Sequence, residues 1–506
     1  MSDDTAAKAL RSDARLVVIE APAGCGKTFQ GAEYVSEAAA HQPKSRVLVL
    51  THTHAACDVF AKRTQRARNI EIRTIDSLIS QIAGVYHTGL DLPEDPAAWA
   101  RKAGSDGYST LAAKSAELLK RAPMIARALA QRYPVIVCDE HQDCTADQHD
   151  IALALHNAGA RLRIFADPMQ SIYTDNVGMA AHRQRWKDLQ DGADVHESLD
   201  TPHRWCRAGA PALGKWILEA RETLRSGGHI DLRGTLPAGL TVVSANNQAQ
   251  RFGQYQLSPG DRKPLDTLVK HSSPLLLLTA QNATARGLRA FFNRRIPLWE
   301  GHTREALATL VASIGEAAGN SALLAQALIT FLEEVAVGLS PSAFGDAFKG
   351  EVASGCTARR RDRPAKIQQL SRLLLDKPSH VGVAEVLRQL ETWIVNDPAF
   401  SDVKIDSRRE FYEAMRLHEF ADCEDGFSEI ARRRTFARPS PPDQAISTVH
   451  KAKGLESDHA AVIPCDARHF DNGFKARCLL YVAISRPRKS LTLVVPSVGP
   501  SPLFIL

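Results

Sequence analysis

A loop of small residues at 21–28 contains the first side chains that could do chemistry. It reads Ala-Pro-Ala-Gly-Cys-Gly-Lys-Thr, follows an apolar run at 16–19 and precedes a helix-compatible stretch. Such a strand, loop and helix start form a cradle for phosphate groups, because loop amides and the helix dipole both point at the anion. Lys27 would bring positive charge to the phosphates, and the Thr28 hydroxyl would ligate Mg²⁺. The sequence therefore predicts a nucleotide-binding loop whose ligand-facing residues are Ala23, Gly24, Cys25, Gly26, Lys27 and Thr28.

A second apolar run, at 133–138, ends in two adjacent carboxylates, Asp139 and Glu140. The carboxyl ends of parallel strands share one edge of a sheet, so we expect these acids beside the loop. Asp139 is suited to hold Mg²⁺ together with Thr28, and Glu140 to polarise an attacking water. An acidic cap on a surface helix would explain one carboxylate, but not the combination with Lys27. The pattern predicts hydrolysis of a Mg²⁺-bound nucleotide.

A series of further segments follows in a fixed order. They are residues 47–56 (Val-Leu-Val-Leu-Thr-His-Thr-His-Ala-Ala), 73–78 (Arg-Thr-Ile-Asp-Ser-Leu), 139–143 (Asp-Glu-His-Gln-Asp), 165–173 (Phe-Ala-Asp-Pro-Met-Gln-Ser-Ile-Tyr), 202–204 (Pro-His-Arg), 448–456 (Thr-Val-His-Lys-Ala-Lys-Gly-Leu-Glu) and 481–488 (Tyr-Val-Ala-Ile-Ser-Arg-Pro-Arg). In content and order they resemble the UvrD/Rep-like family of superfamily 1 DNA helicases. The resemblance runs from residue 16 to the C-terminal region.

The resemblance implies a set of site residues and two cofactors, ATP and Mg²⁺. Gln170 would sense the γ-phosphate, Arg204 would contact it, and Arg486 would act as an arginine finger, a task that suits a permanently charged, forked guanidinium. With Lys27 and Glu140, these three form the expected catalytic set, and Gly454 and Glu456 are expected to contact the nucleotide. The residues expected to contact single-stranded DNA are Thr51, His52, Thr53, Thr74, Ser77, Thr448 and His450.

Apolar β-type runs alternate with helical stretches, which predicts parallel sheets joined by crossover helices. The expected fold class is α/β, and the resemblance implies two RecA-like P-loop motor domains with helical insertions. We assign residues 1–203 to the first motor domain, with a small helical insertion at about 80–130. The second motor domain is expected in two pieces, 204–290 and 443–506. Residues 291–442 would form a helical insertion like the family's 2B subdomain.

The composition suits a globular chain that does not enter a membrane. Of 506 residues 44% are hydrophobic, yet no apolar run approaches the ~20 residues that span a bilayer. The acidic N-terminus lacks a signal-type apolar core, so we expect a cytoplasmic protein. Nine cysteines occur without a C-x-x-C pair, which is typical of isolated reduced thiols.

The charge pattern permits a polyanionic partner without proving one. The formal net charge is +6, and arginines cluster at 359–363 and 432–438. Each cluster could neutralise phosphates or could form a solvated face, and the sequence leaves both interpretations open. An aromatic content of 6% is low for a platform on which bases stack.

Two segments depart from the family pattern where the family grips DNA bases. His52 stands in place of a stacking phenylalanine, and Thr-Asp-Asn at 174–176 replaces an aromatic residue and an arginine. Trp186 and Trp205 are interpreted as core residues rather than as replacements, because tryptophan is highly buried on average. ATP hydrolysis is therefore better supported than strand separation.

The leading hypothesis is an ATP-dependent translocase or helicase that moves 3′ to 5′ on single-stranded or tailed DNA. The alternative is a nucleic-acid-sensing ATPase subunit of an antiphage defence complex, similar to the helicase-like subunits of Gabija-type antiviral systems, which act with a separate nuclease. A superfamily 1 RNA remodeller fits the motif details less well. Because the chain ends soon after Arg486, any cutting activity is expected from another protein.

Overall fold

The computed structural model describes residues 2–64, 67–174, 178–246, 255–299, 304–436 and 441–506. The chain divides into two compact units, one formed by residues 1–299 with 440–506 and the other by residues 300–439. None of the described helices is long and apolar enough to cross a membrane.

The first unit contains a six-stranded sheet in which every pairing is parallel. Its strands, in spatial order, are β3 (Ile70–Thr74), β2 (Val47–Thr51), β4 (Val135–Cys138), β5 (Arg161–Ala166), β1 (Leu16–Glu20) and β6 (Val195–Ser198). Strands β1, β2 and β4 are buried along their whole length. Continuous apolar runs of this kind are typical of parallel strands that are covered on both faces.

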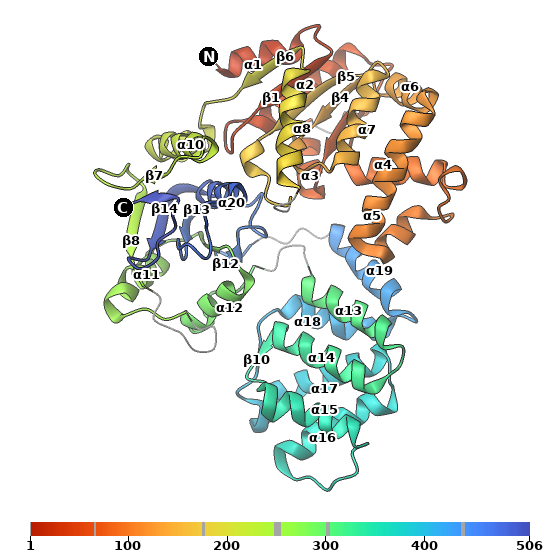
Figure 1. The fold of residues 1–506 in the computed structure, drawn as a ribbon, viewed down its shortest axis with the longest axis vertical. Coiled ribbons are helices and arrows are strands. Elements are labelled where there is room, and N and C mark those ends of the chain that lie inside the picture. The colour runs from red at the N-terminus through yellow and green to blue at the C-terminus, as the bar shows by residue number, and fades with distance from the viewer. Residues whose placement is uncertain (1, 65–66, 175–177, 247–254, 300–303, 437–440) are drawn as a thin grey trace. The chain divides into compact units, whose positions relative to one another are not determined.

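Helices cover both faces of this first sheet (Figure 1). One face packs against α1 (Ser2–Arg11), α2 (Lys27–His41) and α3 (His54–Arg63). The other packs against α4 (Ile75–Val85), α6 (Pro123–Arg132), α7 (Ala146–Asn157) and α8 (Met179–Asp191). The long helix α5 (Pro96–Arg121) and the short turn η1 (Thr88–Leu90) share a core with α4 and α7. Residues 80–130, where the sequence predicted a helical insertion, contain the end of α4, η1, α5 and most of α6, joined by short loops.

A second, five-stranded parallel sheet lies in the same unit. Its strands, in spatial order, are β12 (Gln444–Thr448), β9 (Leu275–Thr279), β13 (Ser457–Val462), β14 (Pro487–Val495) and β8 (Leu240–Ser244). One face packs against α10 (Pro211–Arg225) and α20 (Phe474–Ile484), and the other against α11 (Pro259–His271) and α12 (Asn282–Phe291). A small parallel pair, β7 (Ile230–Asp231) with β15 (Phe504–Ile505), completes this part.

The second unit, residues 300–439, is helical. Its α-helices are α13 (Glu305–Ala317), α14 (Ser321–Val335), α15 (Ala347–Ala353), α16 (Asp362–Asp376), α17 (His380–Asn396), α18 (Arg408–Met415) and α19 (Cys423–Phe436). They are joined by a π-helix, η4 (Pro341–Asp346), and two 3₁₀ helices, η5 (Pro398–Phe400) and η6 (Arg416–Glu419). A two-residue antiparallel pair joins β10 (Ala336–Val337) to β11 (Lys404–Ile405). Apolar residues at helical spacing, such as Leu324, Leu328 and Leu332, form its core. The sequence had predicted the helical insertion over 291–442.

The structure confirms the predicted fold class, α/β with parallel sheets and added helices. It also confirms the strand expected at Leu275–Leu278, which is buried as part of β9. Trp205 is fully buried, as expected for a core residue, and Trp186 is half-buried against the core under the first sheet. All nine cysteines are free.

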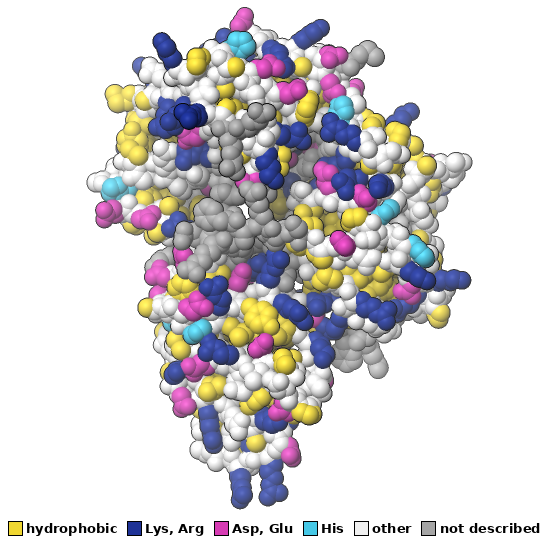
Figure 2. Space-filling model, turned by 180° about the vertical axis from the view of Figure 1, so that it is seen from behind, with side chains coloured by type: hydrophobic (Ala, Val, Ile, Leu, Met, Phe, Trp, Pro, Cys, Tyr) yellow, Lys and Arg dark blue, Asp and Glu magenta, His cyan; other side chains and the backbone are white. Residues whose placement is uncertain are grey.

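Two of the clustered arginines in the second unit have partners within that unit. Arg360 pairs with Glu351, and Arg363 pairs with Asp402. Figure 2 shows Lys and Arg side chains interspersed with Asp and Glu over the face that it presents. The side chains of the other cluster, 432–438, lie outside the described residues. The paired arginines of the first cluster fit the interpretation as a solvated face.

Candidate functional site

The candidate nucleotide site lies at the carboxyl edge of the first sheet. In the strand order, β5 lies between β1 and β4, so the ends of these three strands are neighbours. The loop at 21–28 follows β1, Asp139 and Glu140 follow β4, and η3 (Pro168–Gln170) follows β5. The topology therefore brings the phosphate loop, the two acids and Gln170 to one edge, where ligands of open α/β sheets bind.

Two glycines give the phosphate loop its shape. Gly24 (φ 74°) and Gly26 (φ 89°) both adopt the left-handed conformation that favours glycine. A Cβ on Gly24 would lie 2.8 Å from the Trp205 ring and 2.9 Å from the Cβ of Arg204, so the loop packs directly against the short helix α9 (His203–Arg207). Helix α2 begins right after Gly26 without a side-chain cap. Its first amides are therefore available to an anion.

Lys27 contacts both acids that the sequence placed beside it. Its Nζ lies 2.5 Å from Glu140 Oε1 and 4.0 Å from Asp139 Oδ1. Burial works to lower the pKa of Lys27, but the nearby carboxylates outweigh it and the net pKa is raised. Burial also works to raise the pKa of Glu140, but Lys27 outweighs it and lowers that pKa to about 2. Both side chains are therefore charged at neutral pH.

Asp139 fits the metal ligand that the sequence predicts. Its carboxylate is buried, and Oδ1 has no hydrogen-bond partner among the described residues. Burial raises the pKa of Asp139 to about 7, a cost to the anion that a nearby cation would offset. Thr28 lies in the first turn of α2, across this edge. An oxygen-only donor pair of this kind suits Mg²⁺, which also takes phosphate oxygens and water.

Two arginines reach the site from sequence outside the first sheet. Arg204, in α9, donates to the Ser485 carbonyl (2.6 Å) and to Glu456 Oε1 (2.6 Å), and its own amide donates to the Gly24 carbonyl (3.1 Å). Arg486 donates to the Val482 carbonyl (2.8 Å) and the Ser485 hydroxyl (2.7 Å). Burial, with the adjacent charge of Arg204, lowers the pKa of Arg486 to about 10.

An anion bound between Arg204 and Arg486 would offset the repulsion between these two charges and the cost of burying Arg486. Of the other two residues predicted to contact nucleotide on this side, Glu456 contacts Arg204 directly. Gly454 takes a positive φ of 84° in the turn before it. The structure thus brings Arg204, Arg486 and Glu456 together next to the phosphate loop.

Gln170 belongs to a network that includes the acids. Its Nε2 donates to Asp167 Oδ2 (2.9 Å), and the amide of Asp167 donates to Gln142 Oε1 (3.0 Å). Gln142 in turn donates to Glu140 Oε2 (2.5 Å). Lys453 joins this network from the second sheet, because its Nζ donates to both Asp143 oxygens (2.6 and 2.7 Å) and to the Gln170 carbonyl (2.7 Å).

The residues predicted to contact DNA lie at the carboxyl ends of three other strands. Thr53 and Thr74 are helix caps whose hydroxyls accept from the amides of Ala56 and Ser77 (3.2 Å each). Ser77 Oγ accepts from Arg73, and Thr51 Oγ1 donates to the Thr53 carbonyl. A capping hydroxyl keeps its own proton, which it can donate to a phosphate oxygen.

His52 is turned inward. Its Nε2 lies 3.2 Å from Cys144 Sγ, and burial lowers its pKa. Near β12, Thr448 accepts from the Lys451 amide, and the His450 carbonyl accepts from the Tyr173 hydroxyl (3.4 Å). Tyr173 is 60% exposed and its ring lies 6.4 Å from that of His450. Tyr173 is thus more exposed than His52, although Lys453 Nζ lies 4.8 Å from its ring centroid.

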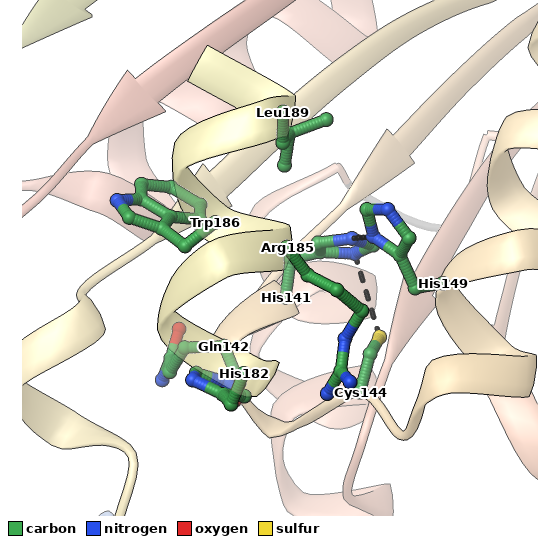
Figure 3. A pocket seen from close by; sticks show the side chains of 8 residues that line it. All are labelled: His141, Gln142, Cys144, His149, His182, Arg185, Trp186 and Leu189. Atoms are coloured by element: carbon green, nitrogen blue, oxygen red, sulfur yellow. Dashed lines mark hydrogen bonds between the residues drawn. The ribbon is translucent and has the colours of Figure 1, made fainter. Parts of the chain in front are cut away.

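A pocket beside the 139–143 segment is lined by His141, His149 and His182, among other residues (Figure 3). His141 Nδ1 lies 3.4 Å from Cys144 Sγ, and its Nε2 lies 2.9 Å from His149 Nδ1. Burial first, and then neighbouring positive groups, lower the pKa of His141. Within the described part of the chain, no group of three or more His, Cys, Asp or Glu side chains is arranged to hold a metal ion.

Sequence reasoning missed three side chains that shape the site. The Tyr481 hydroxyl accepts from the Ala23 amide (2.9 Å), Arg221 pairs with Asp167, and Lys453 bridges to Asp143. Tyr481 and Lys453 lie inside the quoted segments, but nothing in the sequence indicates their partners. Arg221 lies outside all of these segments. Residues 175–176, within the stretch where the family grips bases, lie outside the described residues.

Residues 4–176 match a family model described as an AAA domain. This match covers the phosphate loop, the two acids and Gln170, and these residues form a P-loop ATPase domain of the AAA type. Arg204, Arg486 and the second sheet lie beyond it. A search of curated proteins found no match.

Proposed function

We propose that this protein is an ATP-dependent translocase of the UvrD/Rep-like helicase type, moving 3′ to 5′ on single-stranded DNA. The observation that carries the proposal is the meeting of the phosphate loop with Arg204 and Arg486. Arg204 contacts the loop through Gly24 and the end of α20 through the Ser485 carbonyl. A nucleotide bound there would touch both α/β layers of the first unit, that is, the six-stranded sheet with its helices and the five-stranded sheet with its helices.

The chemistry follows from the charges at the sheet edge. Lys27 and the amides at the start of α2 bind the phosphates, Glu140 orients the attacking water, and Gln170 contacts the γ-phosphate. Bound Mg²⁺, held by Thr28 and Asp139, would neutralise phosphate charge. Arg204 and Arg486 then stabilise the charge that develops on the transferred group. For Lys27 to reach phosphate it must leave Glu140, which frees that carboxylate for water.

Movement on DNA would follow from the loss of the γ-phosphate. Arg204 and Arg486 would each add a contact to the γ-phosphate that hydrolysis removes, so hydrolysis shifts the population of arrangements of the two sheets. In this proposal Thr53 and Thr74 would contact the DNA strand from the first sheet, and Thr448 and His450 would contact it from the second. Alternating grip by these two groups would advance the chain along phosphates.

A second candidate is a nucleic-acid-sensing ATPase that works with a separate nuclease in antiphage defence. The inward position of His52 favours it, because this side chain contacts Cys144 instead of offering a ring to a base. Weak base gripping suits a sensor that hydrolyses ATP on DNA without separating strands.

The test measures the ATP hydrolysis rate with no nucleic acid, with single-stranded DNA and with single-stranded RNA. The proposal predicts stimulation by DNA well above that by RNA. Stimulation by RNA alone would favour the RNA remodeller, and a rate that no nucleic acid changes would overturn the translocase. If DNA stimulates hydrolysis while a duplex with a 3′ tail stays paired, the sensor is favoured.

A further inference from the structure

Arg221, on helix α10, is a buried cation that no motif in the chain predicts. Its side chain is 2% exposed, and arginine is almost never buried so deeply without partners. Its Nε and one terminal nitrogen both donate to Asp167 Oδ1, at 3.0 and 2.8 Å. The same terminal nitrogen donates to Glu20 Oε1 at 2.6 Å, and the other contacts Glu222.

The two buried carboxylates that bind Arg221, Glu20 and Asp167, lie at the carboxyl ends of two neighbouring strands of the first sheet. Glu20 is the last residue of β1, directly before the phosphate loop, and Asp167 follows β5, directly before η3. Arg225 also donates to Glu20 (2.6 Å), and the guanidinium of Arg221 lies 5.9 Å from the Tyr481 ring centroid. Arg221 therefore ties the phosphate loop and the Gln170 turn to each other and to α10.

The two oxygens of Asp167 have different partners. Oδ1 accepts from Arg221 and from the Met169 amide (3.2 Å), whereas Oδ2 accepts from the side-chain amide of Gln170 (2.9 Å). With its Nε2 held by Asp167, the Gln170 amide has a fixed orientation. Asp167 can fix this orientation only if its own carboxylate is fixed, and Arg221 fixes it by donating two hydrogen bonds.

We propose that Arg221 is a positioning residue for nucleotide hydrolysis, which acts through Asp167 to orient Gln170 toward the γ-phosphate. This inference rests on the proposed function, since it assumes that Gln170 contacts ATP. The guanidinium of Arg221 donates to Asp167 Oδ1 through two nitrogens, a paired contact that the single nitrogen of a lysine ammonium cannot reproduce. Misplacement of a catalytic contact by about 1 Å can cost on the order of 10² in rate.

The chain offers a matched control for the loss of a buried arginine. Arg163 is also fully buried and lies on β5, the strand that leads to Asp167, but it donates to the backbone carbonyls of Leu10 and Ser12, among others. These acceptors lie away from the carboxyl edge of the sheet. An Arg163→Gln variant should therefore lower the melting temperature and leave ATP turnover close to that of the parent.

The test compares ATP turnover in the parent, Arg221→Gln, Gln170→Ala and the double variant. We expect each single change to lower kcat by about 10²-fold. We also expect the double variant to match Gln170→Ala within about twofold, because residues that act as a unit are not additive. A purely structural role predicts instead that Arg221→Gln lowers turnover by the same factor in both backgrounds, and this result would overturn the inference.

Arg221→Lys serves if Arg221→Gln does not fold, because it keeps the buried charge. We expect Arg221→Lys to have a lower kcat than the parent but a similar melting temperature. Turnover at the parent rate in this variant would overturn the positioning role. A parent chain that hydrolyses no ATP would overturn the proposed function itself. If the parent is active and the double variant loses turnover by the product of the two single-variant factors, only the inference about Arg221 is overturned.

Discussion

Lys27 and Glu140 form an ion pair in the candidate site, and a nucleotide that binds there must break this pair. The ammonium lies 2.5 Å from the carboxylate, so phosphate must compete with Glu140 for Lys27. Removal of either side chain therefore changes a different step. In the proposed function, the lysine binds the anion and the carboxylate orients the water.

We predict that Lys27→Ala and Glu140→Gln both abolish ATP turnover but differ in nucleotide affinity. The alanine variant loses charge stabilisation of the phosphates and should bind ATP weakly. The glutamine variant keeps the shape of the side chain and removes a charge that competes for Lys27, so it should bind ATP at least as tightly as the parent. Fluorescent-nucleotide binding and phosphate release measure the two properties. Near-normal turnover in either variant would refute the assignment.

The buried histidines make stability depend on pH. Burial lowers the pKa values of His141, His149 and His182 below the usual value of about 6.5. Between the lowered values and 6.5 the unfolded chain binds more protons than the folded one, so stability rises with pH in this window. The free energy of unfolding should fall as pH drops from about 7 to 5. The charged groups that act on His149 and His182 include Asp150, Asp188 and Arg185.

His149→Gln should reduce this pH slope, because glutamine does not titrate and can still bond to His141. Urea unfolding at several pH values measures it, with the exposed His271→Gln as control. An unchanged slope in His149→Gln would contradict the assignment of the pH effect to this cluster.

At the scale of elements, the sequence predicted strands more readily than side-chain partners. Apolar runs such as Leu16–Ile19 and Leu275–Leu278 are continuous because parallel strands are covered on both faces, so they can be recognised locally. Glu20, Asp167 and Arg221 come together only after folding, from positions that no local pattern connects. The inward turn of His52 depends on Cys144, in a different segment, and is equally invisible in the sequence.

The junction between the phosphate loop and α9 leads to a prediction about Gly24. A Cβ at Gly24 meets strain from its φ of 74° and a contact of 2.8 Å with Trp205. Gly209 has a similar φ of 76° with open space around it, so Gly209→Ala isolates the backbone strain. We expect both variants to melt at lower temperature but only Gly24→Ala to lose ATP affinity. Equal affinity in the two would show that loop packing does not control binding.

The whole molecule combines two parallel sheets in one unit with a separate helical unit. The sequence predicted a helical insertion over 291–442 from its helical patterning, and the second unit of the structure spans residues 300–439. Most of the residues that the sequence predicts to contact DNA carry hydroxyl groups, and the Tyr173 ring near His450 is 60% exposed. Binding through phosphates rather than bases should therefore dominate.

We predict that DNA affinity falls steeply with salt and that the isolated chain unwinds duplex poorly. Each phosphate contact releases bound counterions, whereas each lost stacking contact removes about 1–3 kcal/mol that does not depend on salt in this way. Fluorescence anisotropy between 50 and 200 mM salt, roughly the range over which such contacts lose most affinity, measures the slope. Robust unwinding of a duplex with a 3′ tail would refute the weak-helicase interpretation.

The central claim is that residues from both α/β layers of the first unit complete one ATP site. The measurement that tests it is the ATP hydrolysis rate of Arg486→Ala, with single-stranded DNA present, alongside its nucleotide affinity and melting temperature. Arg486 lies beside Arg204 but far along the chain from Lys27, so it can act on ATP only from the second layer. We predict that turnover falls by ~10³ or more, as loss of an arginine finger does, while ATP still binds and the fold is kept. Hydrolysis at the parent rate would contradict the account.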